Sequence, residues 1–215
     1  MDSIGVGSLP IIILSGFFTG CVLALQSVTA LQEFGAVSKT GSMVSLSMVK
    51  ELGPVLTGLM VSGRNAAGMA SEIGSMKVTE QIDAMRALGT DPIRKLVTPR
   101  LIATIFMLFF LTIIADAVGI AGGALVSVGM LGLTASSYLH SSYASLVHGD
   151  IVQGLTKPLF SGFIIATVGC YFGMRTTGGT QGVGRATTQA VVVSSVFIIV
   201  VDFIVTRAMI GIFGS

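Results

Sequence analysis

Charged residues are scarce in this sequence: Asp, Glu, Lys and Arg make up 10% of its 215 residues, and the mean hydropathy is +0.91. A soluble domain carries roughly 25% charged residues, so the composition excludes an ordinary soluble domain. Uncharged runs exceed about 20 residues, the length that a helix needs to cross a bilayer. The strands of a membrane β-barrel would instead alternate apolar and polar residues in short segments. The composition therefore predicts an all-α integral membrane protein.

Motifs that carry catalysis or bind cofactors are also missing. Cys21 and Cys170 lie in apolar runs, which is typical of small buried residues rather than of a disulfide or a metal site. Residues 179–186 have the glycine spacing of a P-loop but lack its Lys and the following Ser or Thr. Neither a metal-site spacing of the two histidines nor a Ser/His/Asp set is discernible. We therefore expect no catalytic centre, metal, cofactor or nucleic acid partner, and no cleavable signal peptide because a basic n-region is missing.

Five apolar runs are long enough to span a membrane. We expect them at about residues 9–32, 42–70, 100–128, 151–174 and 189–212. A turn at 33–41, a loop rich in Ser, Gly and Tyr at 129–150 and a Gly/Thr loop at 175–188 would connect them. Because no soluble domain, linker or internal repeat is visible, we expect residues 1–215 to form a single transmembrane domain.

One polar segment, residues 71–100, interrupts the apolar chain, and we call it the island. It holds five of the twelve Lys and Arg residues. Its apolar residues recur at helical spacing and predict a short amphipathic helix over about 74–89: Val78, Ile82, Met85 and Leu88. A charged helix that is too short to span lies at the membrane surface or docks on a partner. The alternative is a solvated loop whose charges keep it in water.

Local signals predict where the helices of the island begin and end. Gly89 is expected to follow the end of the amphipathic helix. Asp91-Pro92 and Thr98-Pro99 each place a capping side chain before a proline suited to the first helical position. We therefore expect two further helix starts, the second of which leads into the third span.

The distribution of basic residues predicts the orientation of the chain. Seven lie on one side of the expected spans, namely the five of the island together with Arg175 and Arg185. The other side holds Lys39, with Arg207 near the exit of the last span. Because basic residues concentrate in cytoplasmic loops, the island is expected in the cytoplasm. The odd number of spans then places the C-terminus on the periplasmic side.

Charged residues inside the expected spans are the main candidates for function: Lys50, Glu51, Asp116, Lys157 and Asp202. Each would cost about 2.5–3.5 kcal/mol at the centre of a bilayer, so they should face one another or a watery cavity. Such charges either join helices structurally or line a path for a substrate. Pro54 follows Glu51 by three residues and predicts a locally broken helix there.

Several motifs, taken together and in order, resemble the MlaE (YrbE) family of permease subunits of phospholipid ABC transporters. The resemblance covers nearly the whole chain and is carried by Glu51-Leu52-Gly53-Pro54, Gly63-Arg64, Glu72-Ile73-Gly74-Ser75-Met76, Thr79-Glu80-Gln81, Asp91-Pro92, Pro99-Arg100, Gly184-Arg185-Ala186-Thr187-Thr188 and Asp202-Phe203.

The resemblance implies a homodimer of five-span permeases in the bacterial inner membrane, with a cytoplasmic dimer of ABC ATPase subunits that bind ATP and a periplasmic MCE-domain hexamer. A phospholipid would occupy an apolar pocket formed by Leu23, Leu31, Phe34 and Leu52. The polar positions within the membrane would be Lys50, Glu51, Lys157 and Asp202. The island would be a coupling helix that inserts into the ATPase, through Glu72, Met76, Thr79, Glu80, Gln81, Asp83, Met85 and Arg86.

The chain departs from the family pattern in two places. Relatives can carry Arg where this chain has Lys50, and a bidentate ion pair at that position is therefore not assured. Family members usually have an interfacial helical segment before the first span, and here about eight residues precede it. The expected function is transport of phospholipid between the inner membrane and a periplasmic MCE carrier system, which maintains outer-membrane lipid asymmetry. The alternatives are an ion-coupled transporter that uses Asp116 and Asp202, and a structural scaffold for an MCE ring.

Overall fold

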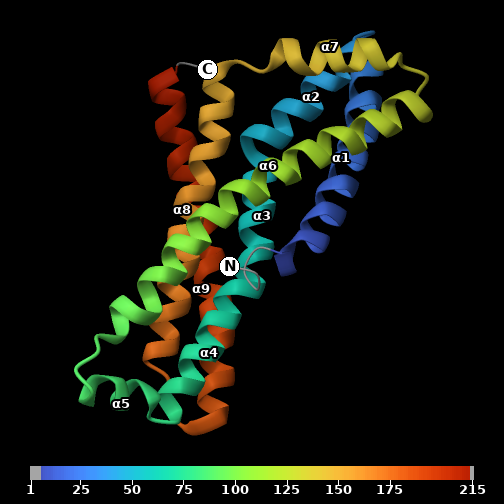
Figure 1. Ribbon diagram of the computed structural model, residues 1–215. Helices are drawn as coiled ribbons and strands as arrows, with labels where there is room; N and C mark the ends of the chain where they lie inside the picture. The colour runs from blue at the N-terminus through green and yellow to red at the C-terminus, as the bar shows by residue number, and fades with distance from the viewer. Residues whose placement is uncertain (1–5, 214–215) are drawn as a thin grey trace. The chain divides into compact units, whose positions relative to one another are not determined.

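A computed structural model of the chain describes residues 6–213, and all regular secondary structure among them is helical (Figure 1). Five helical runs in this part are long and apolar enough to cross a membrane. They are Leu9–Gln32, Val37–Val78, Ile93–Gly129, His148–Met174 and Gly179–Gly211. The prediction of an all-α protein with five spans is therefore confirmed. By its internal contacts the chain divides into two compact units, which we describe separately.

The first unit comprises residues 9–57 and 110–157 together with the segment from Ala208. Its core is a buried cluster of Ala24, Val44, Met48 and Val126. Its helical segments are α1 (Leu9–Gln32), η2 (Val37–Lys39), α2 (Thr40–Ser47), the π-helical turn η3 (Met48–Leu52), the start of α3 (Gly53–Val61), the second half of α6 (Thr98–Gly129), α7 (Ala135–Ser145) and the start of α8 (His148–Met174). Close approach of α1 and α6 requires glycine, because a side chain on Gly20 would collide with the carbonyl of Gly119.

The second unit comprises residues 58–109 and 158–207 together with the segment up to Ser8. Its helical segments are η1 (Val6–Ser8), the end of α3, the π-helical turn η4 (Ser62–Ala66), α4 (Ala67–Val78), α5 (Gln81–Ala87), the π-helical turn η5 (Ile93–Val97), the first half of α6, the second half of α8 and most of α9 (Gly179–Phe213). Gly173 of α8 lies tightly against Ile73 of α4. The hydroxyls of Ser62 and Ser194 are 2.6 Å apart and join η4 to α9.

Two segments expected to be loops are largely helical, and both predictions were wrong. The segment 129–150 contains α7, where the buried Tyr138 donates its hydroxyl proton to the carbonyl of Ile120. Burial raises the pKa of Tyr138 to about 12. The segment 175–188 contains the first turns of α9, because Gly178 and Gly179, at φ 87° and 65°, reverse the chain directly after α8. In both cases tertiary packing outweighs the weak helix propensity of a Ser-, Gly- and Thr-rich sequence.

The island also differs from the single helix expected over about 74–89. Helix α4 ends at Val78, and Glu80 adopts a left-handed backbone at φ 59°, so that α5 begins anew at Gln81. Glu80 is the only non-glycine residue with positive φ among residues 6–213. Such a conformation is rare for glutamate, and the helical spacing of apolar residues does not reveal it.

Two of the three predicted helix boundaries in the island are confirmed. Gly89, at φ 72°, follows α5, where its N–H donates to Arg86 and the N–H of Thr90 donates to Met85, the Schellman pattern. An oxygen of the Asp91 side chain accepts the N–H of Ile93 at 2.9 Å and caps the next helix. The third is met only in part. Helix α6 begins at Thr98, as expected, but it continues the helical run from Ile93 through the π-helical turn η5. The Thr98 hydroxyl donates back to the carbonyl of Ile93 at 3.4 Å instead of capping a new helix.

Candidate functional site

Four charged side chains of the first unit form two ion pairs at the π-helical turn η3. The ammonium of Lys50 lies 2.7 Å from Asp150, and that of Lys157 lies 2.5 Å from Glu51. The side chain of Lys157 is 2% exposed, whereas that of Glu51 is 42% exposed. Two bases and two acids leave the group neutral, which lowers the cost of placing charges in a span. We call these four residues the charge ladder.

Pro54 explains why Lys157 belongs to the ladder. In a regular helix the N–H four residues after Lys50 would donate to its carbonyl, but proline has none. Lys157 supplies the missing donor, since its ammonium donates to the carbonyl of Lys50 at 2.7 Å as well as to Glu51. The local break expected at Pro54 is present as the turn η3, which precedes it. Irregular turns of this kind inside helices frequently occur at functional sites.

Asp150 was missed by sequence reasoning because it fell at the end of an expected loop. The structure places it in the first turn of α8, where it also accepts the N–H of Val147 at 3.1 Å. Asp150 and Lys157 are seven residues apart, about two helical turns, and therefore share one face of α8. The sequence therefore offered one signal: an acid and a base on one face of a helix could pair with the adjacent base and acid, Lys50 and Glu51.

The structure brings together three of the four predicted polar positions, Lys50, Glu51 and Lys157. The fourth, Asp202, lies on α9 in the second unit, and its association with the ladder stays a prediction. Asp116 takes part in neither ion pair, and its carboxylate packs so closely on Gly53 that a side chain at position 53 would collide with it. Asp116 is 8% exposed, and its Oδ1 accepts no hydrogen bond within the described part of the chain.

The four predicted lipid-pocket residues lie along the first unit rather than at one point. Leu23 and Leu52 both pack, half-buried, against the core cluster. Leu31 is in the last turn of α1, about 12 Å beyond Leu23 along the helix axis, and Phe34 follows after the helix ends. Phe34 is 81% exposed and borders an open groove of about 470 Å³ that Gln26, Thr29, Ala30 and Glu33 also line. We call these four residues the apolar stripe: Leu23 and Leu52 lie at the core cluster, and Phe34 lies at the open groove.

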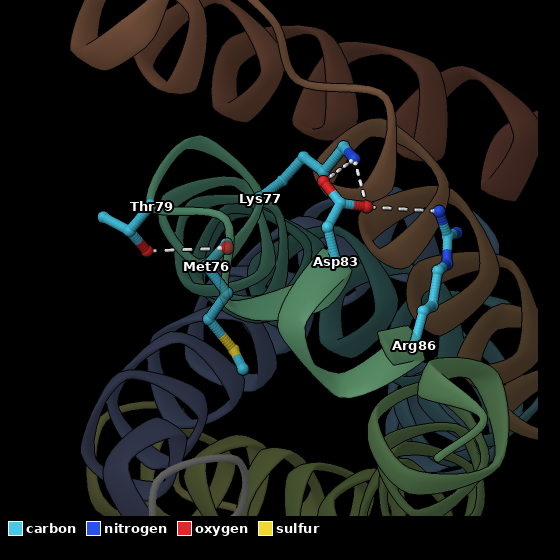
Figure 2. Close-up of polar contacts among 5 residues, drawn as sticks. All are labelled: Met76, Lys77, Thr79, Asp83 and Arg86. Atoms are coloured by element: carbon cyan, nitrogen blue, oxygen red, sulfur yellow. Dashed lines mark hydrogen bonds and ion pairs between the residues drawn. The ribbon is translucent and has the colours of Figure 1, made fainter. Parts of the chain in front are cut away.

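The predicted coupling residues surround the junction between α4 and α5, which is braced by ion pairs (Figure 2). Asp83 lies between Lys77, at 2.8 Å, and Arg86, at 3.3 Å. The ammonium of Lys77 holds the pKa of the Asp83 carboxyl below its usual value, with a smaller contribution from Arg86. The Thr79 hydroxyl donates back to the carbonyls of Ser75, at 2.9 Å, and Met76.

Of the remaining coupling residues, Glu72 pairs with Arg100 at 2.9 Å, and Glu80 and Gln81 are exposed at the turn. Met76 and Met85 are half-buried. The two helices α4 and α5 are thus fixed to each other by charges on one side. Exposed apolar residues remain nearby: Val78, Leu88 and Ile93.

Comparison with known proteins agrees with this architecture. The family model described as "Permease MlaE" matches residues 1–208. The chain belongs to the MlaE permease family. It is therefore a multi-pass membrane protein and a transporter membrane subunit rather than an enzyme.

Individual relatives cover most of the chain. A probable ABC transporter permease protein of Rickettsia typhi is 46% identical over 206 residues, which are 96% of this chain and 80% of the relative. The intermembrane phospholipid transport system permease protein MlaE of Haemophilus influenzae is 37% identical over 98% of this chain and 81% of its own length. The chloroplastic protein trigalactosyldiacylglycerol 1 of Arabidopsis thaliana is 38% identical over 96% of this chain and 59% of its own length. The match thus extends across both compact units.

Proposed function

We propose that this chain is the membrane subunit of an ATP-driven phospholipid transporter in a bacterial inner membrane. The observation that carries the proposal is the charge ladder. Its four charged side chains are neutral in sum and lie inside a span, and Glu51 is followed directly in sequence by the apolar Leu52. A phospholipid presents the same combination of a charged headgroup and apolar tails. The name of the Haemophilus influenzae relative, which specifies intermembrane phospholipid transport, supports this substrate.

Within this proposal the ladder is the polar part of the lipid path. Glu51 and Lys50 keep 42% and 25% of their side chains exposed, so both can meet a headgroup without leaving their partners. The stripe of Leu23, Leu31, Phe34 and Leu52 supplies apolar surface for the tails. A phospholipid tail needs a groove of roughly 15 Å, half of the hydrocarbon thickness, which two copies of the chain about a two-fold axis would enclose. The stripe therefore forms one wall of a cavity in a homodimer that opens toward a periplasmic MCE hexamer.

The island is the proposed contact with a cytoplasmic ATPase dimer, which binds and hydrolyses the ATP. Val78, Leu88 and Ile93 expose 36%, 82% and 58% of their surfaces close to the braced junction of α4 and α5. An apolar edge on a rigid, charged element suits insertion into a groove of a partner protein. The name of the Rickettsia typhi relative, an ABC transporter permease, supports an ATPase partner.

Reconstitution tests the proposal. The chain is placed in vesicles with its ATPase subunit, and ATP-dependent movement of a fluorescent phospholipid to an acceptor is measured. Glu51→Gln preserves size and an acceptor oxygen but removes the charge. We expect transport to fall at least tenfold, which is more than the accompanying fall in stability explains. Some stability is lost because the ammonium of Lys157, 2% exposed, no longer has its counter-charge. Lipid movement that persists without the ATPase, driven by an ion gradient, would contradict the proposal. Equal losses of transport and stability would assign the ladder a purely structural role.

A further inference from the structure

A cleft of about 350 Å³ in the second unit lies where α8 ends and α9 begins. Its lining is mostly polar or aromatic: Tyr171, Phe172, Arg175, Thr176, Thr177, Gly182, Arg185, Ala186 and Gln189. A shallower hollow continues from it along α9 and shares Arg185 and Gln189. The cleft contains two arginines and no acidic residue. Its volume lies at the lower end of the range for small-molecule sites, enough for a headgroup but not for a whole lipid.

The two arginines differ from most of the other basic residues of this region, although Lys95 also forms no ion pair among the described residues. Lys77, Arg86, Arg94 and Arg100 all lie within 4 Å of a carboxylate. Among the described residues, 6–213, neither Arg175 nor Arg185 forms an ion pair. The positive charge of the cleft is therefore available to an anionic ligand.

The cleft is held in place by its surroundings. The guanidinium of Arg175 lies 5.4 Å from the centre of the Tyr171 ring and also donates to the Tyr171 hydroxyl. Thr176 is 5% exposed, and its hydroxyl donates to the carbonyl of Phe172 at 3.1 Å. Gly182 lies so close to the carbonyl of Thr177 that no side chain fits there. These contacts fix the reversal between the helices and hold the Arg175 side chain against α8.

The depth of the cleft in the membrane follows from the length of α9. This helix has 35 residues and is about 52 Å long, whereas the hydrocarbon core of a bilayer is about 30 Å thick. Residues 179–188 are mainly Gly, Thr, Gln and Arg, and the long apolar run starts only at Ala190. The first turns of α9 therefore extend beyond the hydrocarbon into the headgroup layer. Tyr171, an aromatic residue with a polar tip, is typical of the same layer.

We propose that this Arg175–Arg185 cleft binds the phosphate headgroup of an anionic phospholipid from the surrounding leaflet. A guanidinium presents paired N–H donors that match two phosphate oxygens, and a basic pocket between transmembrane helices suits anionic headgroups. Thr177 and Gln189 supply further hydrogen-bonding groups in the lining. The ladder and the apolar stripe belong to the first unit. The cleft and the proposed transport path therefore consist of different residues and can be tested separately.

A tryptophan placed in the cleft can report binding, because the chain has no tryptophan of its own. The full-length Phe172→Trp chain is reconstituted in phosphatidylcholine vesicles that contain either brominated phosphatidylglycerol or brominated phosphatidylcholine. We expect stronger quenching by the brominated phosphatidylglycerol. Arg175→Gln and Arg185→Gln together should weaken this preference about 30-fold, about fivefold for each, which corresponds to about 1 kcal/mol per arginine.

One control variant and four outcomes test the proposal. Arg94→Gln removes the same charge from a side chain that is 90% exposed outside the cleft, and it should retain the preference. Equal quenching by the two brominated lipids, or loss of the preference in Arg94→Gln as well, would overturn the proposal. Competition by millimolar inorganic phosphate would assign the cleft to a soluble anion instead of a lipid. Loss of ATPase co-purification in the double variant, without any lipid preference in the parent chain, would assign it to a protein interface.

Discussion

Lys157→Met tests the role of the buried lysine in the charge ladder. Methionine keeps a long unbranched side chain at a position that is 2% exposed, so the change removes the charge with little change in packing. It abolishes two hydrogen bonds at once, one to Glu51 and one to the carbonyl of Lys50. The carbonyl matters most, because Pro54 has no N–H with which to replace the lost donor.

The two losses can be weighed separately. The carbonyl of Lys50 is partly buried, and leaving it without this donor costs up to the roughly 1–3 kcal/mol of a buried group, here about 2 kcal/mol. The lost ion pair adds about 1 kcal/mol or less, since the Glu51 side chain is 42% exposed and is therefore screened by its surroundings. We expect a total destabilisation of about 3 kcal/mol. For a chain of this size that corresponds to a fall in melting temperature of roughly 6–12 °C.

The two cysteines provide the assay. Cys170 is buried and Cys21 is half-buried, so a thiol-reactive dye in detergent reports their exposure as the chain is heated. Lys95→Met, at an exposed position of the island, is the matched control and should leave the melting temperature unchanged. Pro54→Ala restores a backbone N–H four residues after Lys50 and should recover part of the stability lost in Lys157→Met. An unaltered melting temperature in Lys157→Met, or no recovery in the double variant, would refute the reasoning.

Three further predictions follow from the same contacts. Asp116→Asn keeps the shape that fits Gly53 and adds hydrogen-bond donors, so the free energy of unfolding should change by no more than about 1 kcal/mol. Gly53→Ala should lower the melting temperature strongly, because the added methyl group collides with Asp116. The lowered pKa of Asp83 means that its stabilising effect persists at neutral pH and is lost as the pH falls below its usual value of 3.8. Proteolysis of the island should therefore be faster in acid than at neutral pH in the parent chain. In Asp83→Asn, acid should cause no such increase. Leu88→Asp should reduce ATPase co-purification and leave membrane insertion unchanged, and equal recovery of the ATPase would contradict docking at this edge.

Much of the fold could be predicted because the relevant physics is local in sequence. Apolar runs show the five spans directly. The cost of charge in a bilayer led to the expectation that the five charges inside the spans face one another or a watery cavity, and the structure places Lys50, Glu51 and Lys157 together. Gly89 and Asp91 mark helix ends through backbone hydrogen bonds that span only a few residues, so their roles were visible from short motifs.

The remaining features depend on contacts between distant segments. Helix α7 has too few apolar residues to show a helical pattern, and it is held by Tyr138, whose partner Ile120 is eighteen residues away. The left-handed Glu80 is tolerated where Asp83 and Lys77 fasten the helices on either side of it. Asp150 could be assigned to the ladder only once Lys50, a hundred residues earlier in the chain, was seen beside it.

Lysine suits position 50 at least as well as arginine would, and the reason is local. Asp150 offers Oδ1 to the ammonium of Lys50 at 2.7 Å, while its Oδ2 accepts the backbone N–H of Val147 at 3.1 Å. A guanidinium gains its advantage over an ammonium when two acceptor oxygens are open to it at once. Here one oxygen of Asp150 already accepts the N–H that fixes the first turn of α8. The single ammonium of lysine is enough to pair with the other oxygen. Lysine also leaves its other two N–H donors free to turn toward the exposed side of the ladder, where the proposed headgroup would approach.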